Sequence, residues 1–69
     1  MTIYVEYDGE DFSYESSIAP RIGENIIYEQ ENEGITQYFK VLSVAYYTNG
    51  GYNEIHIKAE LEYEESFNE

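Results

Sequence analysis

The chain has 69 residues, 15 of them Asp or Glu and three Lys or Arg, and its formal net charge at pH 7 is −12. This length leaves room for one domain with a thin core, and the lack of cysteine excludes a disulfide or a thiolate metal site. No stretch of the sequence approaches the roughly 20 apolar residues of a membrane-spanning helix, and an anionic surface is repelled by nucleic acid and anionic lipid. Because 42% of the residues are hydrophobic and 17% aromatic, we expect one folded domain over 1–69, in the cytoplasm, that binds neither nucleic acid nor membrane directly.

The N-terminal part of the chain predicts a hairpin. Residues 3–7 alternate apolar and polar side chains, which is typical of a half-buried strand. The segment 8–11 begins with Asp8-Gly9, a pair that favours a tight turn, and the alternation resumes over 12–15.

The middle of the chain predicts a connection and a third strand. The segment 17–23 contains the single proline, Pro20, which has no amide hydrogen and disfavours a central strand. Residues 25–30 alternate again, with Ile26 and Tyr28 on one face, and 31–34 form a polar turn.

The C-terminal part predicts the longest hairpin, with strands over 36–47 and 52–63 joined by the turn residues 48–51. Every second residue of the last strand is apolar and is expected to face the core. These residues are Ile55, Ile57, Ala59, Leu61 and Tyr63.

The apolar residues of 36–47 change phase along the strand. Phe39 and Val41 belong to one face and the apolar residues after them to the other, so either both faces are partly covered or a bulge near Ser43 switches the phase. No segment has helical periodicity. We therefore expect an all-β fold with little or no helix, either a small, highly twisted antiparallel sheet or a small five-stranded barrel, with residues 65–69 frayed.

Catalysis finds little support in the sequence. His56 is the only histidine and is expected on the polar face of a strand. There is no cysteine nucleophile and no serine in a Gly-x-Ser-x-Gly turn. The acidic turn around Gly9 departs from the spacing of a calcium-binding loop. We expect no enzymatic activity, no cofactor and no metal site.

The carboxylates themselves are the most informative set. Residues two apart in a strand share a face and lie about 6.6–6.8 Å apart, which approximates the spacing of successive phosphates in nucleic acid. Such rows would offer acceptors to Lys and Arg side chains that grip phosphates. The predicted rows are Glu6, Asp8 and Glu10, with Asp11 beside them; Glu29, Glu31 and Glu33; and Glu60, Glu62 and Glu64. The alternative is an adaptation for solubility or to high salt, although a small domain usually needs a net charge of only about 2 to 8 in magnitude.

Nine tyrosines exceed what a thin core absorbs. Tyr4, Tyr47 and Tyr52 fall in the outward phase or beside turns, and exposed tyrosine is enriched at protein interfaces. We expect these three to contact a partner, although aromatic residues also simply favour strands.

In size, acidity, lack of cysteine and acidic hairpins, the chain resembles the small inhibitors that bacteriophages and mobile elements encode against host DNA-handling proteins. They include anti-CRISPR, anti-restriction and uracil-DNA glycosylase inhibitor proteins. The resemblance implies a non-enzymatic DNA mimic that blocks the basic nucleic-acid-binding site of a host nuclease, CRISPR effector or similar protein. Such a phage protein would act in the host cytoplasm as a monomer or homodimer.

Two alternatives stay open. A structural or assembly module would self-associate through its sheet, using Leu42, Val44 and Tyr46. A small-ligand binder would need a concave pocket, and the anionic surface disfavours nucleotide-like ligands.

Overall fold

The computed structural model describes residues 1–49 and 52–66, and these form one five-stranded sheet with the strand order β2-β1-β5-β4-β3. β1 and β5 run parallel, whereas the other neighbouring strands are antiparallel. The predicted all-β fold is confirmed; the sheet is mixed rather than purely antiparallel, and it is not closed into a barrel. The elements are β1 (Thr2–Tyr7), β2 (Glu10–Glu15), β3 (Asn25–Gln30), a single 3-10 turn η1 (Glu31–Glu33), β4 (Ile35–Asn49) and β5 (Tyr52–Ser66).

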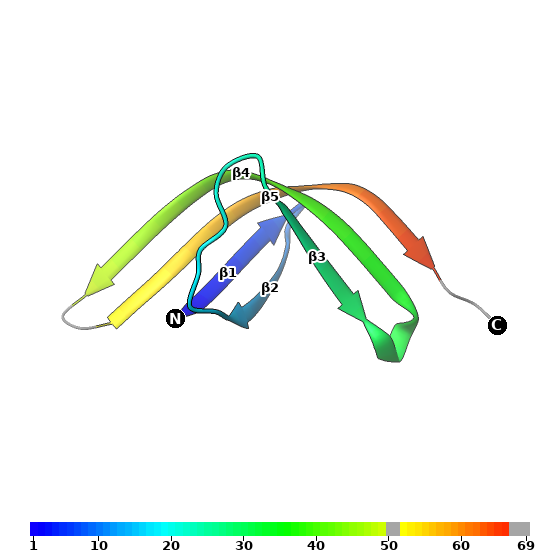
Figure 1. Ribbon diagram of the computed structural model, residues 1–69, viewed down its shortest axis with the longest axis horizontal. Helices are drawn as coiled ribbons and strands as arrows, with labels where there is room; N and C mark the ends of the chain where they lie inside the picture. Colours follow the sequence, from blue (N-terminus) through cyan, green and yellow to red (C-terminus); the bar gives the residue numbers. More distant parts are fainter. Residues whose placement is uncertain (50–51, 67–69) are drawn as a thin grey trace.

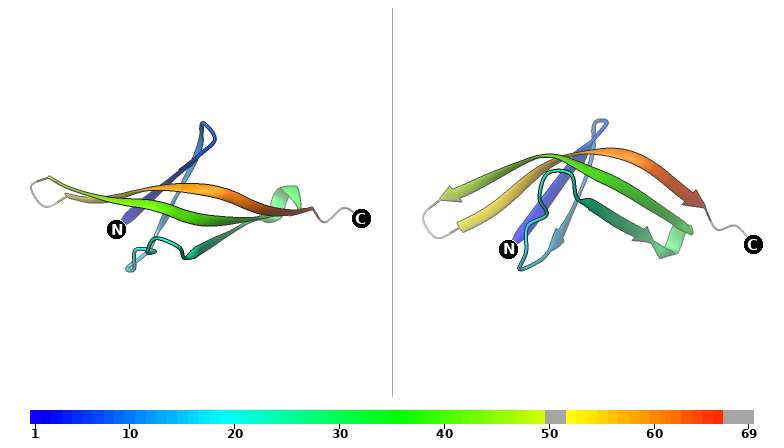
Figure 2. Two further views of the ribbon diagram at one scale, coloured as in Figure 1. Left: turned by 90° about the horizontal axis from the view of Figure 1, so that it is seen from above. Right: turned by 45° about the horizontal axis from the view of Figure 1, so that its top comes forward.

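The long β4–β5 hairpin bends into an arch with two arms (Figures 1 and 2). β1 pairs with β5 over 54–58, and β2 pairs with the other edge of β1. We call these paired strands, together with the part of β4 beside 54–58, the β1 arm. β3 pairs with β4 over 35–40, and with the end of β5 these strands make the β3 arm. The hairpin therefore gains strands on its β5 edge in the β1 arm and on its β4 edge in the β3 arm.

Two register shifts interrupt the β4–β5 ladder. Val41 lies opposite Ala59 but Ser43 lies opposite Lys58, so Leu42 is an extra residue and the predicted bulge near Ser43 is confirmed. The second shift was not predicted.

At the second shift, Phe39 lies opposite Leu61 but Tyr38 lies opposite Tyr63, which leaves Glu62 as the extra residue of β5. The bulge moves Tyr63 to the face of Tyr38, and Tyr63 is 58% exposed. The expectation that Tyr63 faces the core is therefore wrong, because one extra residue reverses the faces of all that follow.

The β1–β2 turn confirms the predicted tight hairpin. It has only Asp8 and Gly9, whose φ angles of 46° and 79° are both positive. Glycine adopts such angles freely and aspartate is among the few other residues that tolerate them. Glu10 and Asp11 already belong to β2.

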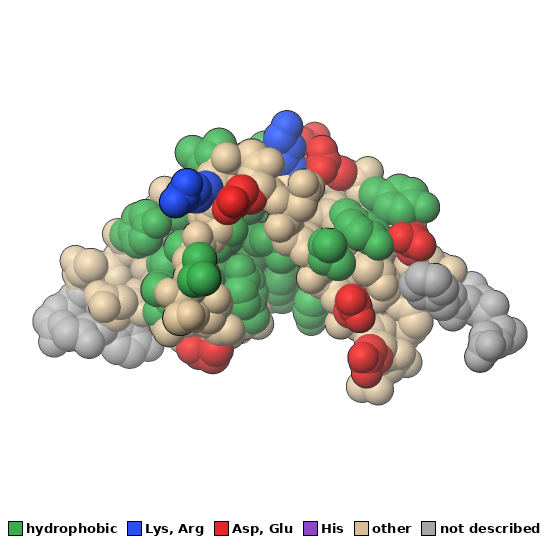
Figure 3. Space-filling model, in the orientation of Figure 1, with side chains coloured by type: hydrophobic (Ala, Val, Ile, Leu, Met, Phe, Trp, Pro, Cys, Tyr) green, Lys and Arg blue, Asp and Glu red, His purple; other side chains and the backbone are tan. Residues whose placement is uncertain are grey.

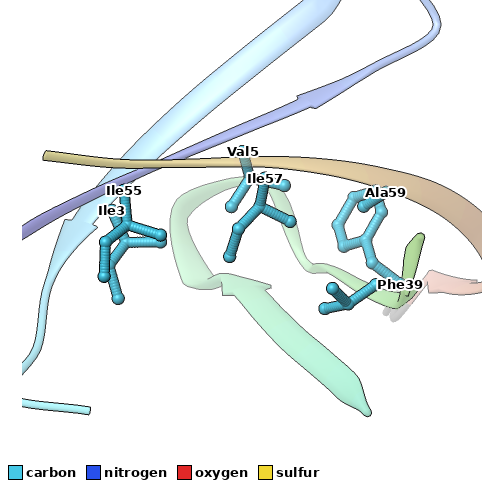
Figure 4. Close-up of a cluster of buried hydrophobic side chains, with 7 residues drawn as sticks. Ile3, Val5, Phe39, Ile55, Ile57 and Ala59 are labelled. Carbon is cyan, nitrogen blue, oxygen red and sulfur yellow. The ribbon is translucent and has the colours of Figure 1, made fainter. Parts of the chain in front are cut away.

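The core lies on the inner face of the arch. Side chains from β1, β4 and β5 meet there, as Figure 4 shows for most of them. Each large apolar side chain buried in this way contributes roughly 1.5–3 kcal/mol. The fully buried large residues are Ile3, Val5, Phe39, Val41, Ile55 and Ile57.

The sheet curls until its two edge strands approach each other beneath the arch. The ring of Phe12 from β2 stacks on the ring of Tyr28 from β3, with centroids 4.2 Å apart and 8° between the planes. Figure 3 shows the hollow under the arch, with hydrophobic side chains inside it. Ring contacts, rather than backbone hydrogen bonds, connect the two edges.

Backbone hydrogen bonds anchor the connection between β2 and β3 to β4. The segment 16–24 contains Pro20 and no strand, as predicted, and Val41 of β4 exchanges backbone hydrogen bonds with Gly23 and Glu24. Of the residues expected to fray, Glu65 and Ser66 pair with β4, and 67–69 lie outside the described residues. No helix in the described ranges is long and apolar enough to cross a membrane.

Candidate anionic interface

The predicted row of Glu60, Glu62 and Glu64 does not form. The bulge at Glu62 separates Glu60 from Glu64, which lies opposite Gln37. The Gln37 side chain is buried, and its Nε2 donates to Glu64 Oε1 at 2.9 Å. Glu62 Oε1 instead accepts a hydrogen bond from Asn25 Nδ2 at 3.0 Å. The row prediction is wrong because the bulge places neighbouring carboxylates in different surroundings.

The row of Glu6, Asp8 and Glu10 is also absent. The chain reverses at Asp8, so Glu6 lies directly opposite Asp11 and Glu10 lies opposite Tyr7. A straight row is thereby replaced by a cross-strand pair of like charges, whose mutual repulsion destabilises the hairpin.

The third predicted row is bent by a turn. Glu29 is in β3, whereas Glu31 and Glu33 are in η1, which ends at Gly34 in the left-handed conformation with φ 67°. The three carboxylates therefore follow a tight curve instead of one face of a strand.

The fold nevertheless separates the carboxylates into two groups. One group already has a partner: six side chains accept hydrogen bonds or form ion pairs, namely Glu15, Glu24, Glu54, Glu62, Glu64 and Glu65. The other group has neither kind of partner within the part of the chain that the structure describes. Apart from Glu60, it is confined to the segments 6–11 and 29–33. Its members are Glu6, Asp8, Glu10, Asp11, Glu29, Glu31, Glu33 and Glu60.

These two acidic segments flank one cavity of about 370 Å³, which is lined by Glu10 and Asp11 on one side and Glu33 on the other. The floor includes Gln37, whose Oε1 accepts from Gln30 Nε2 at 2.9 Å. Two turns that lie far apart in the sequence thus concentrate unpaired negative charge around one opening.

Two of the three tyrosines predicted to contact a partner come together on the outer face. The ring of His56 lies between them, with centroids 5.0 Å from Tyr4 and 4.5 Å from Tyr47. Nε2 of His56 is 3.0 Å from Glu54 Oε1, and the histidine is exposed, as expected. The side chain of Tyr52 lies outside the described residues. Tyr4 and Tyr47 line a cavity of about 200 Å³ together with Glu6, which connects this aromatic cluster to the first acidic segment.

A second exposed apolar group was missed from the sequence. Ile27, Tyr38 and Tyr63 lie opposite one another on successive strands of the β3 arm. Figure 3 shows hydrophobic side chains in line across this arm, with acidic side chains beside them. No signal in the sequence reveals the line, because it depends on the bulge at Glu62.

Within this line, the pKa of Tyr38 is raised. The main cause is the hydrogen bond that its hydroxyl donates to Glu65 Oε1 at 2.7 Å, followed by burial and by the negative charges of Glu65 and Glu29. The exposed aromatic surface of the β3 arm is therefore held in place by a carboxylate.

In the described ranges, no group of three or more His, Asp or Glu side chains is arranged to hold a metal ion. No protein-family model, curated protein or solved structure matches the chain. The resemblance to phage-encoded inhibitors stays a prediction, and the side chains described above are the basis for inferring a function.

Proposed function

We propose that this protein is a non-enzymatic inhibitor of the kind that phages encode, which mimics the charge of nucleic acid and occupies the basic nucleic-acid-binding site of a host defence or DNA-processing protein. Its place of action would be the host cytoplasm. The observation that carries the proposal is the gathering of unpaired carboxylates in 6–11 and 29–33, around one cavity.

Unpaired carboxylates are available to a partner at little cost. A carboxylate that already accepts a hydrogen bond must give it up or share it, whereas a solvated one exchanges only water for a Lys or Arg side chain. A net charge of −12 also steers a basic partner toward the chain and accelerates association. Because the predicted rows are bent or broken, the expected mimicry is of two dense groups of charge rather than of evenly spaced phosphates.

The aromatic cluster supplies an anchor next to the charge. Tyrosines are over-represented among the few residues that dominate binding energy at interfaces. Tyr4 and Tyr47 lie on the same outer face as Glu6. We expect the inhibitor to bury this cluster while 6–11 contacts basic side chains at its edge.

Self-association is a second candidate function, because Leu42 and Tyr46 are 48% and 68% exposed. Val44, the third residue expected in that interface, packs against the core instead. Two copies would also bring together two surfaces of the same charge, which disfavours a dimer at low salt. Light scattering at low and physiological salt tests this candidate directly, since an assembly module would be oligomeric at both.

The experiment for the inhibitor proposal is affinity capture from a bacterial lysate on the immobilised chain, with and without competing double-stranded DNA. We expect a captured nucleic-acid-binding protein that is released by a salt step and displaced by the DNA. The salt dependence should be steep because the contacts are mainly electrostatic.

Charge-matched variants locate the interface. Glu10→Lys with Glu33→Lys reverses one residue on each side of the cavity, and Glu15→Lys with Glu62→Lys reverses two residues that already have partners and lie outside the aromatic cluster. Each replacement adds two charges, so both double variants have a net charge of −8 instead of −12. The first pair should abolish capture and the second should largely preserve it. Capture that is lost equally in both, or that resists both salt and DNA, contradicts the proposal.

A further inference from the structure

A third cavity, of about 450 Å³, lies under the arch and is separated from the acidic cavity by the ring stack. Its walls come from β2, from β3 and from the connection 16–24. They are mainly apolar and aromatic, and include Phe12, Tyr14, Ile18, Pro20, Ile26 and Tyr28. Pockets for small molecules usually have this lining and a volume of roughly 300–1,000 Å³.

The position of the ring stack decides what kind of ligand fits. Phe12 and Tyr28 line both this cavity and the acidic one, so their stacked rings form the wall between the two. An extended peptide that closed the gap between β2 and β3 would have to displace the stack. A compact molecule fits beside it without any rearrangement.

Two polar side chains of the lining each have an oxygen that is left to accept a hydrogen bond. Glu24 Oε1 accepts from the backbone amide of Arg21 at 2.6 Å, and its second oxygen has no partner among the described residues. Asn25 donates through Nδ2 to the carbonyl of Phe39 and to Glu62, which leaves its own amide oxygen to accept. Among the residues that the structure describes, no Lys, Arg or His lines the cavity.

Tyr14 adds no charge to the apolar wall. With an ordinary pKa of 10.0 its hydroxyl is neutral at physiological pH, and burial raises that pKa further. The fixed negative charge of the lining comes from Glu24.

We propose that this cavity binds a small, flat, lipophilic cation. Its aromatic part would lie against Phe12 and Tyr28, and its positive group would face the carboxylate of Glu24. Aromatic faces attract cations, and the overall charge of −12 repels an anion of the same shape. The proposal does not rest on the inhibitory function, because all of its residues lie outside 6–11 and 29–33, although Phe12 and Tyr28 are next to these segments.

The test uses two probes with the same ring and opposite charge, (2-naphthylmethyl)trimethylammonium and 2-naphthalenesulfonate, each titrated into the full chain labelled with ¹⁵N at physiological salt. The cation should shift amide signals in 12–14, 18–20 and 24–28, and the sulfonate should not. Equal binding of both probes, or shifts spread evenly over the acidic surface, would overturn the proposal. So would equally tight binding of the uncharged 2-naphthalenemethanol, because the ligand would then be apolar rather than cationic.

Two variants separate the local carboxylate from bulk charge. Glu24→Gln keeps the oxygen that accepts from Arg21 but removes the charge, and should weaken the cation about 5- to 10-fold. Glu29→Gln makes the same change in net charge on the outer face of β3 and should alter the affinity less than twofold. Equal weakening in both variants would mean that only net charge attracts the probe, which overturns the assignment of the site.

A third variant fills the space. Ala19→Leu adds three carbon atoms to the lining, and should abolish binding while the amide spectrum of the strands is retained. Undiminished binding places the cation elsewhere and overturns the proposal. If the variant does not fold, the amide shifts of the natural chain and the comparison of Glu24→Gln with Glu29→Gln still decide the question.

Discussion

The two arms of the arch are held together by different forces. In the β1 arm, β1 is paired on both sides and contributes Ile3 and Val5, which pack with Ile55 and Ile57 of β5. All four side chains are essentially inaccessible to solvent. Apolar burial therefore determines the stability of this arm.

The β3 arm relies more on polar bonds. Gln37 is only 7% exposed, and it lies in a chain of hydrogen bonds from Gln30 through Gln37 to Glu64. On the opposite face, Tyr38 donates to Glu65. The difference shows that the carboxylates of the last strand other than Glu60 serve the fold, whereas those of 6–11 and 29–33 do not. Mutations should affect the two arms in correspondingly different ways.

The largest effect is expected from Ile57→Ala in the β1 arm. Removing a buried isoleucine costs about 2–5 kcal/mol, a large part of the 5–15 kcal/mol that is typical of a whole domain. Urea denaturation followed by circular dichroism measures the loss. Ile27→Ala on the exposed face of the β3 arm is the control, with an expected change within about 0.5 kcal/mol. Equal losses in both variants would show that the arms do not differ in this way.

A smaller, pH-dependent effect is expected from Gln37→Glu in the β3 arm. The new carboxyl would be buried beside Glu64, and an unpaired buried charge should cost about 2–3 kcal/mol at neutral pH. Burial and the neighbouring charge raise the pKa of such a carboxyl in the folded state. The loss should therefore be complete well above that pKa and shrink as the pH falls toward the unfolded value of about 4.3.

Gln37→Leu is the matched control, because it removes the same hydrogen bonds without adding charge. We expect a change of about 1 kcal/mol or less, since Gln30 and Glu64 are near enough to the surface to bond with water instead. A Gln37→Glu variant as stable as Gln37→Leu at pH 7 would show that the β3 arm tolerates charge at this position.

The smallest expected effect is a change in the pKa of one of two tyrosines, whose pKa values are raised for different reasons. Burial raises the pKa of Tyr14 in the β1 arm, and mainly the hydrogen bond to Glu65 raises that of Tyr38 in the β3 arm. Glu65→Gln should lower the pKa of Tyr38 toward its ordinary value of 10.0 and leave Tyr14 unchanged. Titration of ring signals by NMR measures both hydroxyls.

The raised pKa of Tyr38 also predicts how the stability of the fold depends on pH. A raised pKa in the folded state means that the stabilisation by the Tyr38 hydrogen bond is complete below pH 10 and is lost as the pH rises through the folded value. Glu65→Gln should therefore reduce this loss of stability at alkaline pH. An identical alkaline loss in the variant would assign it to other groups.

Most of the fold could be predicted because the sequence alternates so regularly. The third strand was predicted over 25–30 and is found over Asn25–Gln30, and Asp8-Gly9 correctly indicated the first hairpin. The parallel pairing of β1 with β5 could not be predicted, because alternation describes one strand and not its neighbour. The bulge at Glu62 has no signal in the sequence either, because Leu61 and Tyr63 continue the alternation of apolar residues along the last strand.

The acidic residues of the candidate interface could be listed from the sequence, but their arrangement could not. Among the described residues, the carboxylates without partners lie in 6–11 and 29–33 and at Glu60, whereas Glu62 and Glu64 are bonded within the fold. Which carboxylate finds a partner depends on contacts such as Asn25 with Glu62, which join positions distant in the sequence. The apolar cavity depends on the curl of the sheet, and the curl is a property of the assembled strands.

The parallel pairing of β1 with β5 also has a consequence for synthesis. Thr2 lies opposite Glu54, so β1 is synthesised well before the strand with which it pairs in parallel. Until β5 is made, Ile3 and Val5 can pair only within the β1–β2 hairpin, and a two-stranded hairpin is marginally stable in water. Contacts this distant in sequence slow folding, and the nascent chain carries an apolar strand without its parallel neighbour while β2, β3 and β4 are made. The acidic residues of the first hairpin would keep that intermediate from aggregating before β5 is available.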